Sequence, residues 1–342
     1  MGVPNQVYGL ADTGPMRVAW AALALVGFAA LAVARKEPRE PHPSHPVGPD
    51  AVWQSGEQFL GSIQKLCGQE SLAKNVIAAG ECLVQRMASF PQQMASSASP
   101  AAIEFTHAIH GEGWLRDFRK VARVDIAYVE YPFRTGASDG WLLVNGSPPV
   151  VDVDNLQKLP KAEMAENLAW SQMIASHPGA ALFRDDRSGN MDPLAIVHTD
   201  ESQEFVVAYK ALDGCAKCAQ LGVAFLGYEF NPKGKLTGTE FLDFSAGADV
   251  PARPIHIHSG EHFSLALKGD PKHEWTLAQE PAHWILRSVN QATDKNTGTV
   301  SWNFEAISNG STQMTLLYSS TDAPESGESL PLHVVAAPGL GH

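Results

Sequence analysis

Apolar residues recur at three- and four-residue spacing in three early segments of the chain, residues 55–69, 71–90 and 99–121. This spacing is typical of helices that bury one face. Ser71 and Ser99 stand where the N-cap residues of two such helices are expected. The pattern therefore predicts a helical start to the folded part of the chain.

The pattern then changes to that of β-structure. Residues 123–133 and 139–153 are rich in β-branched and aromatic residues, and a turn-like run of Gly, Ser and Asp separates them. A helical pattern over residues 160–177 comes next, and a hairpin pattern over residues 223–244 follows. We therefore predict an α+β domain over residues 51–246, with helices first and a mostly antiparallel sheet after them.

A Gly-, Ala- and Pro-rich run at residues 245–254 marks a boundary, and the pattern beyond it is entirely β. Short alternating segments separated by Gly, Asn and Pro turns continue over about 90 residues, which suits a small β-sandwich. The sequence therefore predicts a second, all-β domain over residues 248–337.

Two stretches of this region, residues 260–277 and 298–320, carry a family resemblance, together with the last strand pattern at 330–337. The residues that match the family pattern are Gly260, Glu261, Asp270, Pro271, Trp275, Trp302, Phe304, Gly310 and Tyr318. They resemble the chagasin family of cysteine-protease inhibitors. The resemblance covers about a quarter of the chain and implies an immunoglobulin-like sandwich.

The resemblance also implies that three loops at one end of the sandwich bind a partner. The residues at the matching places are Gly269, Asp270, Pro271, Lys272, His273, Gly298, Ser319 and Ser320. The first loop keeps the family's Pro but adds charge and lacks its Gly, the second has one Gly, and the third lacks the family's Arg-Pro-Trp. An aromatic side chain with an Arg is the kind of anchor that carries binding energy. We therefore expect a divergent inhibitor-like domain whose partner is a papain-like cysteine protease or another envelope protein.

The aromatic residues of this region also have a structural interpretation. Trp275, Trp302, Phe304 and Tyr318 fall in the predicted strands and would fill the space between two sheets. We expect these four side chains in the core of the sandwich.

The N-terminal residues 1–36 contain an uninterrupted apolar run of 17 residues, 18–34, which follows Arg17 and ends in Ala32-Val33-Ala34. These are the features of a signal peptide and its cleavage site. An uncleaved membrane anchor and a buried core helix are the alternatives, because ~17 residues is the lower limit for a spanning helix. Residues 37–50 are rich in Pro and His and predict a disordered linker. We expect a periplasmic or extracellular protein, either released or held at the inner membrane through residues 18–34.

The net charge and the cysteine content restrict the possible classes of function further. The formal net charge of −12 and the absence of a basic patch argue against nucleic-acid binding. An even number of cysteines in an exported chain indicates disulfides. We expect the pairs Cys67–Cys82 and Cys215–Cys218 because the members of each pair are close in sequence, and other pairings remain open.

The middle cysteines allow three uses. The Asp-Gly-Cys-x-x-Cys run and the hairpin after it, residues 212–236, resemble a segment of uncharacterised exported bacterial proteins. A disulfide that ties a turn is the interpretation that we adopt, since no helical pattern follows the pair as it does in thioredoxin-type sites. A redox-active pair and a zinc site are the alternatives, but a second pair of zinc ligands at fixed spacing is missing.

Other candidate chemistry is sparse. His256 and His258 would point to the same face of a strand near Glu261 and His262, but no second ligand motif accompanies them. The sequence contains no serine-hydrolase elbow, phosphate-binding loop or zinc-protease helix motif. We expect no metal, no cofactor and no catalytic residue. Two alternatives to a protein-binding role stay open: a periplasmic redox or metal-handling protein that uses Cys215 and Cys218, and a structural envelope protein.

The cysteine assignment predicts the redox state of the chain. After export, a thiol titration of the denatured protein should find close to zero free thiols, because both pairs are oxidised. Four free thiols would contradict both the pairing and the compartment.

Overall fold

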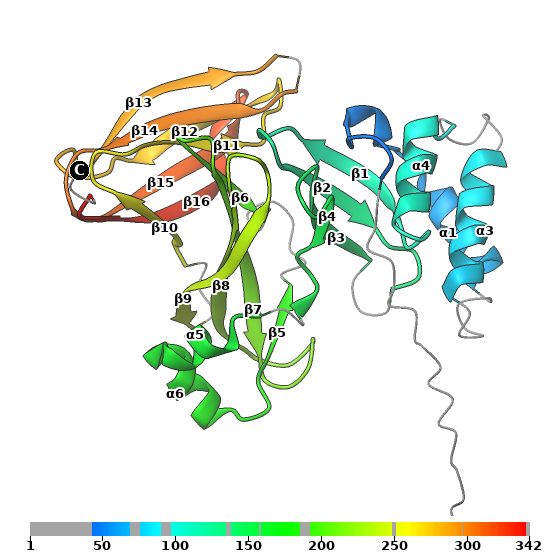
Figure 1. Cartoon of the computed structure of the whole chain (residues 1–342), viewed down its shortest axis with the longest axis horizontal. Coiled ribbons are helices and arrows are strands. Elements are labelled where there is room, and N and C mark those ends of the chain that lie inside the picture. The colour runs from blue at the N-terminus through cyan, green and yellow to red at the C-terminus, as the bar shows by residue number, and fades with distance from the viewer. Residues whose placement is uncertain are drawn as a thin grey trace, which may run out of the picture. The chain divides into compact units, whose positions relative to one another are not determined.

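The computed structural model describes residues 43–68, 76–89, 97–134, 138–156, 159–184, 192–247, 251–295 and 297–339 (Figure 1). These residues belong to one compact unit. The expected signal peptide or anchor, residues 1–36, lies outside them. Over the described part of the chain, no helix has the length and apolar character needed to span a membrane.

The chain begins with helices where the periodicity predicts them. They are α1 (Glu57–Leu66), α3 (Val76–Ser89) and α4 (Pro100–Ala108). Ser99 caps α4 as predicted, since its hydroxyl accepts a hydrogen bond from the Ala102 amide; Ser71 lies outside the described residues. Trp53, Phe59 and Trp114 pack edge to face in the core between these helices and the sheet that follows.

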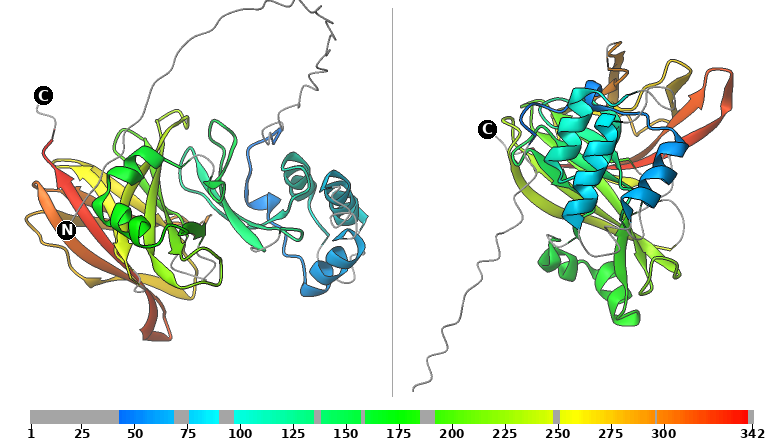
Figure 2. Two further views of the ribbon diagram at one scale, coloured as in Figure 1. Left: turned by 90° about the horizontal axis from the view of Figure 1, so that it is seen from below. Right: turned by 90° about the vertical axis from the view of Figure 1, so that its right-hand side faces the viewer.

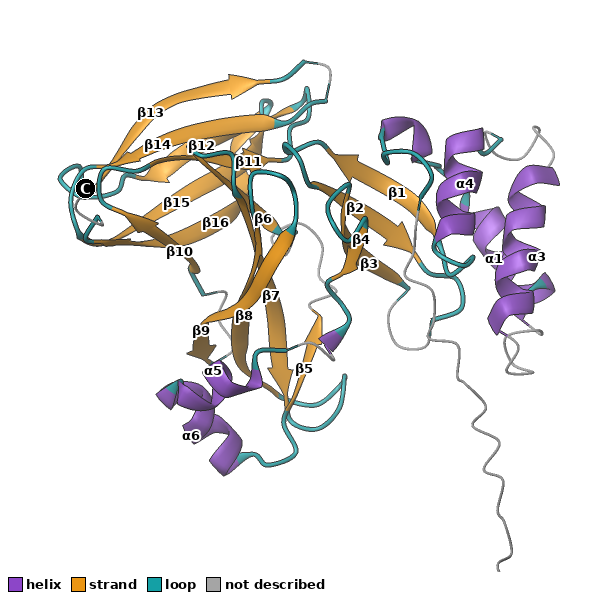
Figure 3. Ribbon diagram, viewed as in Figure 1, coloured by secondary structure: helices purple, strands orange, loops and turns teal. Residues whose placement is uncertain are grey.

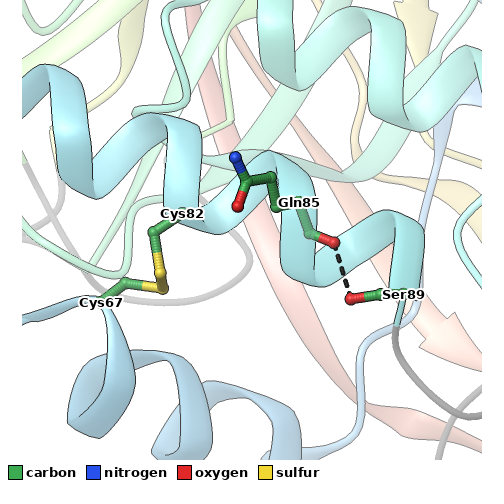
Figure 4. Close-up of a disulfide and its surroundings, with 4 residues drawn as sticks. All are labelled: Cys67, Cys82, Gln85 and Ser89. Carbon is green, nitrogen blue, oxygen red and sulfur yellow. Dashed lines mark hydrogen bonds between the residues drawn. A yellow bond between two sulfur atoms is a disulfide. The ribbon is translucent and has the colours of Figure 1, made fainter.

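The first expected disulfide is present in this helical region. Cys67 directly follows α1, and Cys82 lies within α3, so the bond joins the two helices (Figure 4). The same view shows the Ser89 hydroxyl donating to the Gln85 carbonyl in the last turn of α3. The pairing Cys67–Cys82 therefore agrees with the expectation from sequence.

Part of the expected linker, residues 43–50, is ordered. Val47 is buried, and its backbone exchanges two hydrogen bonds with the side-chain amide of Asn145, at 2.7 and 2.8 Å. A short 3₁₀ turn, η1 (Pro49–Ala51), follows. Pro and His content predicted disorder here, but one buried Val and one amide pair are sufficient to attach the segment to the sheet.

The first sheet is an antiparallel meander of four strands. Its strands are β1 (Trp114–Arg119), β2 (Asp125–Glu130), β3 (Asp139–Val144) and β4 (Val150–Asp152). Because side chains alternate along a strand, one face buries Ala127 and Val129 against α4, and the other buries Ile126 and Leu143 against the next sheet. Figure 2 shows helices α1, α3 and α4 gathered on the far side of this meander from the larger sheet.

The helical pattern at 160–177 forms two helices instead of one. They are α5 (Lys161–Glu166) and α6 (Leu168–Ser176). Asn167 between them has an extended backbone, and its side chain accepts a hydrogen bond from the Trp170 amide at 2.9 Å. An Asn that caps a new helix interrupts the preceding one, which the apolar spacing alone does not reveal.

The largest sheet crosses the boundary that the sequence suggested between two domains. Its strand order is β13-β14-β11-β6-β7-β8-β9, with β5 paired to β7. The strands are β5 (Ala181–Arg184), β6 (Leu194–His198), β7 (Gln203–Leu212), β8 (Gln220–Phe230), β9 (Leu236–Ala246), β11 (His262–Leu267), β13 (Leu286–Thr293) and β14 (Val300–Ala306). Strand β6, from the expected α+β domain, pairs antiparallel with β11, from the expected sandwich. Residues 51–246 and 248–337 therefore share one sheet.

A third sheet faces part of this largest sheet and completes a sandwich. It has the order β10-β16-β15-β12 and contains β10 (Arg253–His258), β12 (His273–Gln279), β15 (Gly310–Ser320) and β16 (Ala323–Ala337). Strand β10 runs parallel to β16, and the other pairs are antiparallel. The core between the sheets includes Leu265 and Phe304 from one side and Leu316 and Val334 from the other. It also includes Ile196 and other residues of β6, β7 and β8, so the core too extends across the expected boundary.

The aromatic residues assigned to the sandwich core divide into two groups. Trp302 and Phe304 are buried, as expected, with 6% and 0% of their surfaces exposed. Trp275 and Tyr318 are only half-buried, although Trp275 packs against the edge of the core. Both lie at the end of the sandwich where loops join the strands, so the facing sheet does not cover them.

The shared sheet makes a prediction about cooperativity. Replacing the fully buried Leu265 of β11 by Ala should lower the free energy of unfolding by about 2–5 kcal/mol. Denaturant unfolding followed by far-UV circular dichroism and by Trp fluorescence should show one coincident transition. The control Val289→Ala, at a position 49% exposed, should change stability by about 0.5 kcal/mol or less. Two separate transitions would show that the sandwich unfolds independently of the rest.

Candidate functional site

Three connections meet at one end of the sandwich. They are the β11–β12 loop (268–272), the β13–β14 loop (294–299) and the β15–β16 turn (321–322). Figure 3 distinguishes such loops, in teal, from the orange strands that carry them. We call this end the loop tip. Together with His273 and Ser320 at the adjoining ends of β12 and β15, it contains the residues that the sequence assigned to partner binding, apart from Ser319.

The first two loops touch through their glycines. A Cβ built on Gly269 would lie 1.8 Å from the carbonyl oxygen of Gly298, so no larger residue fits at this crossing without displacement. Gly298 has a φ of +69°, which a residue with a side chain rarely adopts. These two glycines therefore allow the loops to lie directly against each other.

The first loop also joins the third. The backbone amide of Thr321 donates to the carbonyl of Lys272 at 2.9 Å, and His273 pairs with Ser320 across β12 and β15. Within the loop, the Asp270 carboxylate accepts a hydrogen bond from the Lys272 amide at 2.7 Å. This bond, together with the nearby His273 side chain, holds the pKa of Asp270 below its usual value. The loop is thus a defined turn closed by its own acidic residue.

Stacked rings support the base of the tip. The His273 ring lies 5.0 Å from Tyr318, and the Tyr318 ring lies 4.8 Å from Trp275. The Trp275 indole donates to the carbonyl of Lys268 at 2.7 Å, which ties β12 back to the loop that precedes it. Burial, with the charges of Asp270 and Glu328, raises the pKa of Tyr318 to about 12, so its hydroxyl is neutral at physiological pH.

Most of the expected binding residues are accessible to a partner. Asp270, Pro271, Lys272 and His273 are exposed, while Gly269, Gly298 and Ser320 are half-buried. Ser319 is different, since it lies within β15 with 1% of its surface exposed. The strand continues further than the sequence pattern suggested. Ser319 lies on the opposite face of β15 from the core residues Met314 and Leu316, yet its side chain is buried and a partner cannot reach it.

Residues far away in sequence close one flank of the loop tip. The Lys268 ammonium contacts the Asp117 carboxylate at 2.8 Å, and the Thr299 hydroxyl donates to the Lys120 carbonyl at 2.8 Å. Asp117 and Lys120 belong to β1 and the segment after it. No local signal in the sequence could have placed them here, because the contacts join residues 151 and 179 positions apart. The accessible part of the tip is therefore residues 270–273 with the β15–β16 turn.

The second expected disulfide, Cys215–Cys218, is also present. It lies in the exposed turn between β7 and β8, where no helix begins. The two disulfides together indicate a compartment outside the cytoplasm. The cysteine pair therefore lies in a turn, as the sequence predicted, and not at a helix N-terminus as in a thioredoxin-type site.

The histidine-rich stretch near β10 occupies the other end of the sandwich. His256 and His258 project on the same side of β10, and the Glu261 carboxylate accepts a hydrogen bond from the His258 amide at 2.9 Å. Glu261 also pairs with His198 of β6, which the sequence did not indicate. Among the described residues, no three His, Cys, Asp or Glu side chains are grouped so that they could hold a metal ion.

Comparisons with known proteins give one structural likeness. No protein-family model and no curated protein matches the chain. Among solved structures, the chain is similar to the cysteine protease inhibitor EhICP2 from Entamoeba histolytica, with 16% sequence identity and a TM-score of 0.22. The likeness covers 25% of this chain and 86% of that chain. A TM-score of this size does not establish a common fold.

The contact between the loops predicts the effect of a small substitution. Gly269→Ala should lower the free energy of unfolding by about 1–3 kcal/mol, because the added methyl group forces two backbones apart. The control Gly179→Ala, which meets no atom within 4 Å, should shift stability by no more than about 0.5 kcal/mol. Equal denaturation midpoints for the two variants would show that the loops do not touch in solution.

Proposed function

We propose that this protein binds another protein through the loop tip, and that its partner is a papain-like cysteine protease. The observation that carries the proposal is the convergence of three loops from separate parts of the chain into one tip. Its first loop and the start of β12 project four exposed residues, Asp270 to His273. A narrow tip of this kind suits insertion into a cleft, and the active site of a papain-like protease is a cleft.

We also propose that residues 253–337 form an immunoglobulin-like sandwich. The second, fifth and fourth strands, β11, β14 and β13, are neighbours in one sheet. The third, sixth and seventh strands, β12, β15 and β16, are neighbours in the other. This is the strand order of the immunoglobulin fold, with the first strand, β10, placed parallel to the last. In that fold, loops at one end of the sandwich commonly form binding surfaces.

The physical properties of the tip support binding to a protein. Its first loop is held by the Asp270 turn and by the contact with Gly298, so little conformational entropy is lost when a partner binds. His273 stacked on Tyr318 supplies aromatic surface, and Lys272 supplies a charge. No Arg or Trp follows Tyr318 in the third loop. We infer that the first loop carries more of the contact than it does in the family that the sequence resembles.

The proposed location follows from the cysteines and the N-terminus. Two disulfides accord with an oxidising compartment, and the apolar run 18–34 has the features of an export signal or an anchor. We propose that the chain acts in the periplasm or outside the cell, where it would meet a secreted or envelope protease.

The test measures inhibition of papain by the full chain, with a fluorogenic peptide as substrate. The isolated sandwich is unsuitable because β11 would lose its partner β6. We expect the unmodified chain to inhibit papain. The triple variant Pro271→Ala/Lys272→Ala/His273→Ala should inhibit it at least about tenfold more weakly, because it lacks a central contact with the protease.

A matched control places three alanines at the opposite end of the strands, at Gln279, Glu280 and His283, all exposed. This control should inhibit papain as the unmodified chain does. Absence of inhibition at micromolar concentration, or equal inhibition by both triple variants, would reject the loop tip as a protease-binding surface.

A further inference from the structure

A cavity of about 900 Å³ lies away from the loop tip, between the β6–β9 part of the large sheet and β10. It is lined by the end of β6, the start of β7, the β8–β9 hairpin, β10 and the end of β16. Its size is in the range of small-molecule binding sites. Neither the proposed protease-binding function nor the disulfides account for it.

The floor of this cavity holds a buried acid without a partner. Glu204 of β7 lines the cavity with only 8% of its surface exposed, and its carboxylate has no hydrogen-bonding partner among the described residues. Gly227 on the neighbouring strand makes the room, since a Cβ there would lie 2.7 Å from Oε1 of Glu204. A buried carboxylate costs free energy unless a cation or a donor compensates it. An unpaired one that faces a cavity therefore points to a ligand.

Acidic side chains predominate around Glu204. The cavity is lined by four further carboxylates, from Asp200, Glu229, Glu240 and Glu261, and by no Lys or Arg. Burial raises the pKa of Glu204 to about 7, and the charges of Glu240 and Glu229 contribute to this shift against the opposing charge of His198. Burial and Glu229 likewise raise the pKa of Glu240. The carboxylates repel one another, and a positive ligand would relieve that repulsion.

One of the acids already has a counter-charge. Glu261 is bonded to His198, and although burial opposes protonation of this imidazole, the bond with Glu261 raises its pKa overall. The pair lines the cavity, and the Asp200 carboxylate accepts hydrogen bonds from Ser202, which leaves Glu204, Glu229 and Glu240 as the remaining acids of the lining. These three lie on adjacent strands, β7, β8 and β9, and so form a row across the sheet.

We propose that this cavity binds a small organic polycation of the polyamine class, with Glu204 as the buried anchor for one ammonium group. A linear polyamine carries positive charges at intervals, which matches carboxylates spread over three strands. A single metal ion does not match, because no three potential ligands among the described residues are grouped closely enough to coordinate it.

The proposal predicts that binding of the cation weakens as the pH falls. A bound cation favours ionised Glu204, so binding should be strongest above pH 7 and should weaken about tenfold per pH unit below it. Asp200, Glu229, Glu240 and Glu261 face the same space as acids, and His198, His256 and His258 face it as bases. A positive charge on His198 also disfavours a bound cation, so this residue acts in the same direction as Glu204 when the pH falls.

The test is isothermal titration calorimetry of the purified full chain with spermidine at pH 8. We expect binding that Glu204→Gln weakens at least tenfold. The control Glu280→Gln removes the same charge from an exposed site outside the cavity and should leave the affinity unchanged. The double variant Glu229→Gln/Glu240→Gln removes the other two carboxylates of the row and should also weaken spermidine binding at least tenfold. Circular dichroism should show that each variant is folded.

Two further measurements, at lower pH and in the presence of Mg²⁺, distinguish a specific binding site from general electrostatic attraction. Lowering the pH from 8 to 6 should weaken spermidine binding by more than tenfold in the unmodified chain and by clearly less in Glu204→Gln. Mg²⁺ at the same concentration should not displace spermidine. Equal spermidine affinity in Glu204→Gln and Glu280→Gln, or displacement by Mg²⁺, would overturn the proposal. No detectable spermidine binding at millimolar concentration would overturn it as well.

Discussion

The antiparallel pairing of β6 with β11 is the interaction on which the rest of the structure depends. It joins a sheet built before residue 247 to the sandwich built after it, in a register that places Leu265 opposite Ile196 and Ala266 opposite Ala195. Leu265 and Ile196 point into the sandwich core, and the two alanines point into the core below the first sheet. One strand pair thus closes two hydrophobic cores. Without it, each part would expose an unpaired strand edge and an apolar face.

This pairing also sets where the candidate sites can lie. Strand β11 begins beside His198 and Glu261 and ends at Leu267, directly before the first loop, so the acidic cavity and the loop tip are at its two ends. At the tip, the first sheet reaches the sandwich through Asp117 and Lys120 and narrows the accessible surface to the first and third loops. At the other end, the larger sheet extends beyond the facing strands, and its side chains line a cavity in place of a packed core. A sandwich standing alone would have neither feature.

Much of the local structure was predictable, and the errors share a cause. Apolar spacing located α1, α3 and α4, the Ser99 cap and the β8–β9 hairpin, because each depends on neighbouring residues. The same reasoning failed where a local pattern was overruled. Asn167 divides a helix by capping the next one, Val47 orders an expected linker, and Ser319 is buried because β15 extends past the predicted turn. Glu204 looked like any acid at the start of a strand, and only its place opposite Gly227 makes it unusual.

The sequence by itself determined the mostly β character of the second half, the helical start and the Gly and Pro positions that form the first loop, and it favoured the two disulfide pairs while other pairings stayed open. These features depend on periodicity, turn chemistry and short separations along the chain, which a sequence displays directly. Only the tertiary structure decided that the two expected domains share a sheet, which loop residues stay accessible, and that carboxylates from three strands face one cavity. The shared sheet depends on pairings between residues more than sixty positions apart, and the residue pattern of either strand does not contain the register of that pairing. The row of carboxylates depends on the registers of β7, β8 and β9, which set side chains from three strands beside one another.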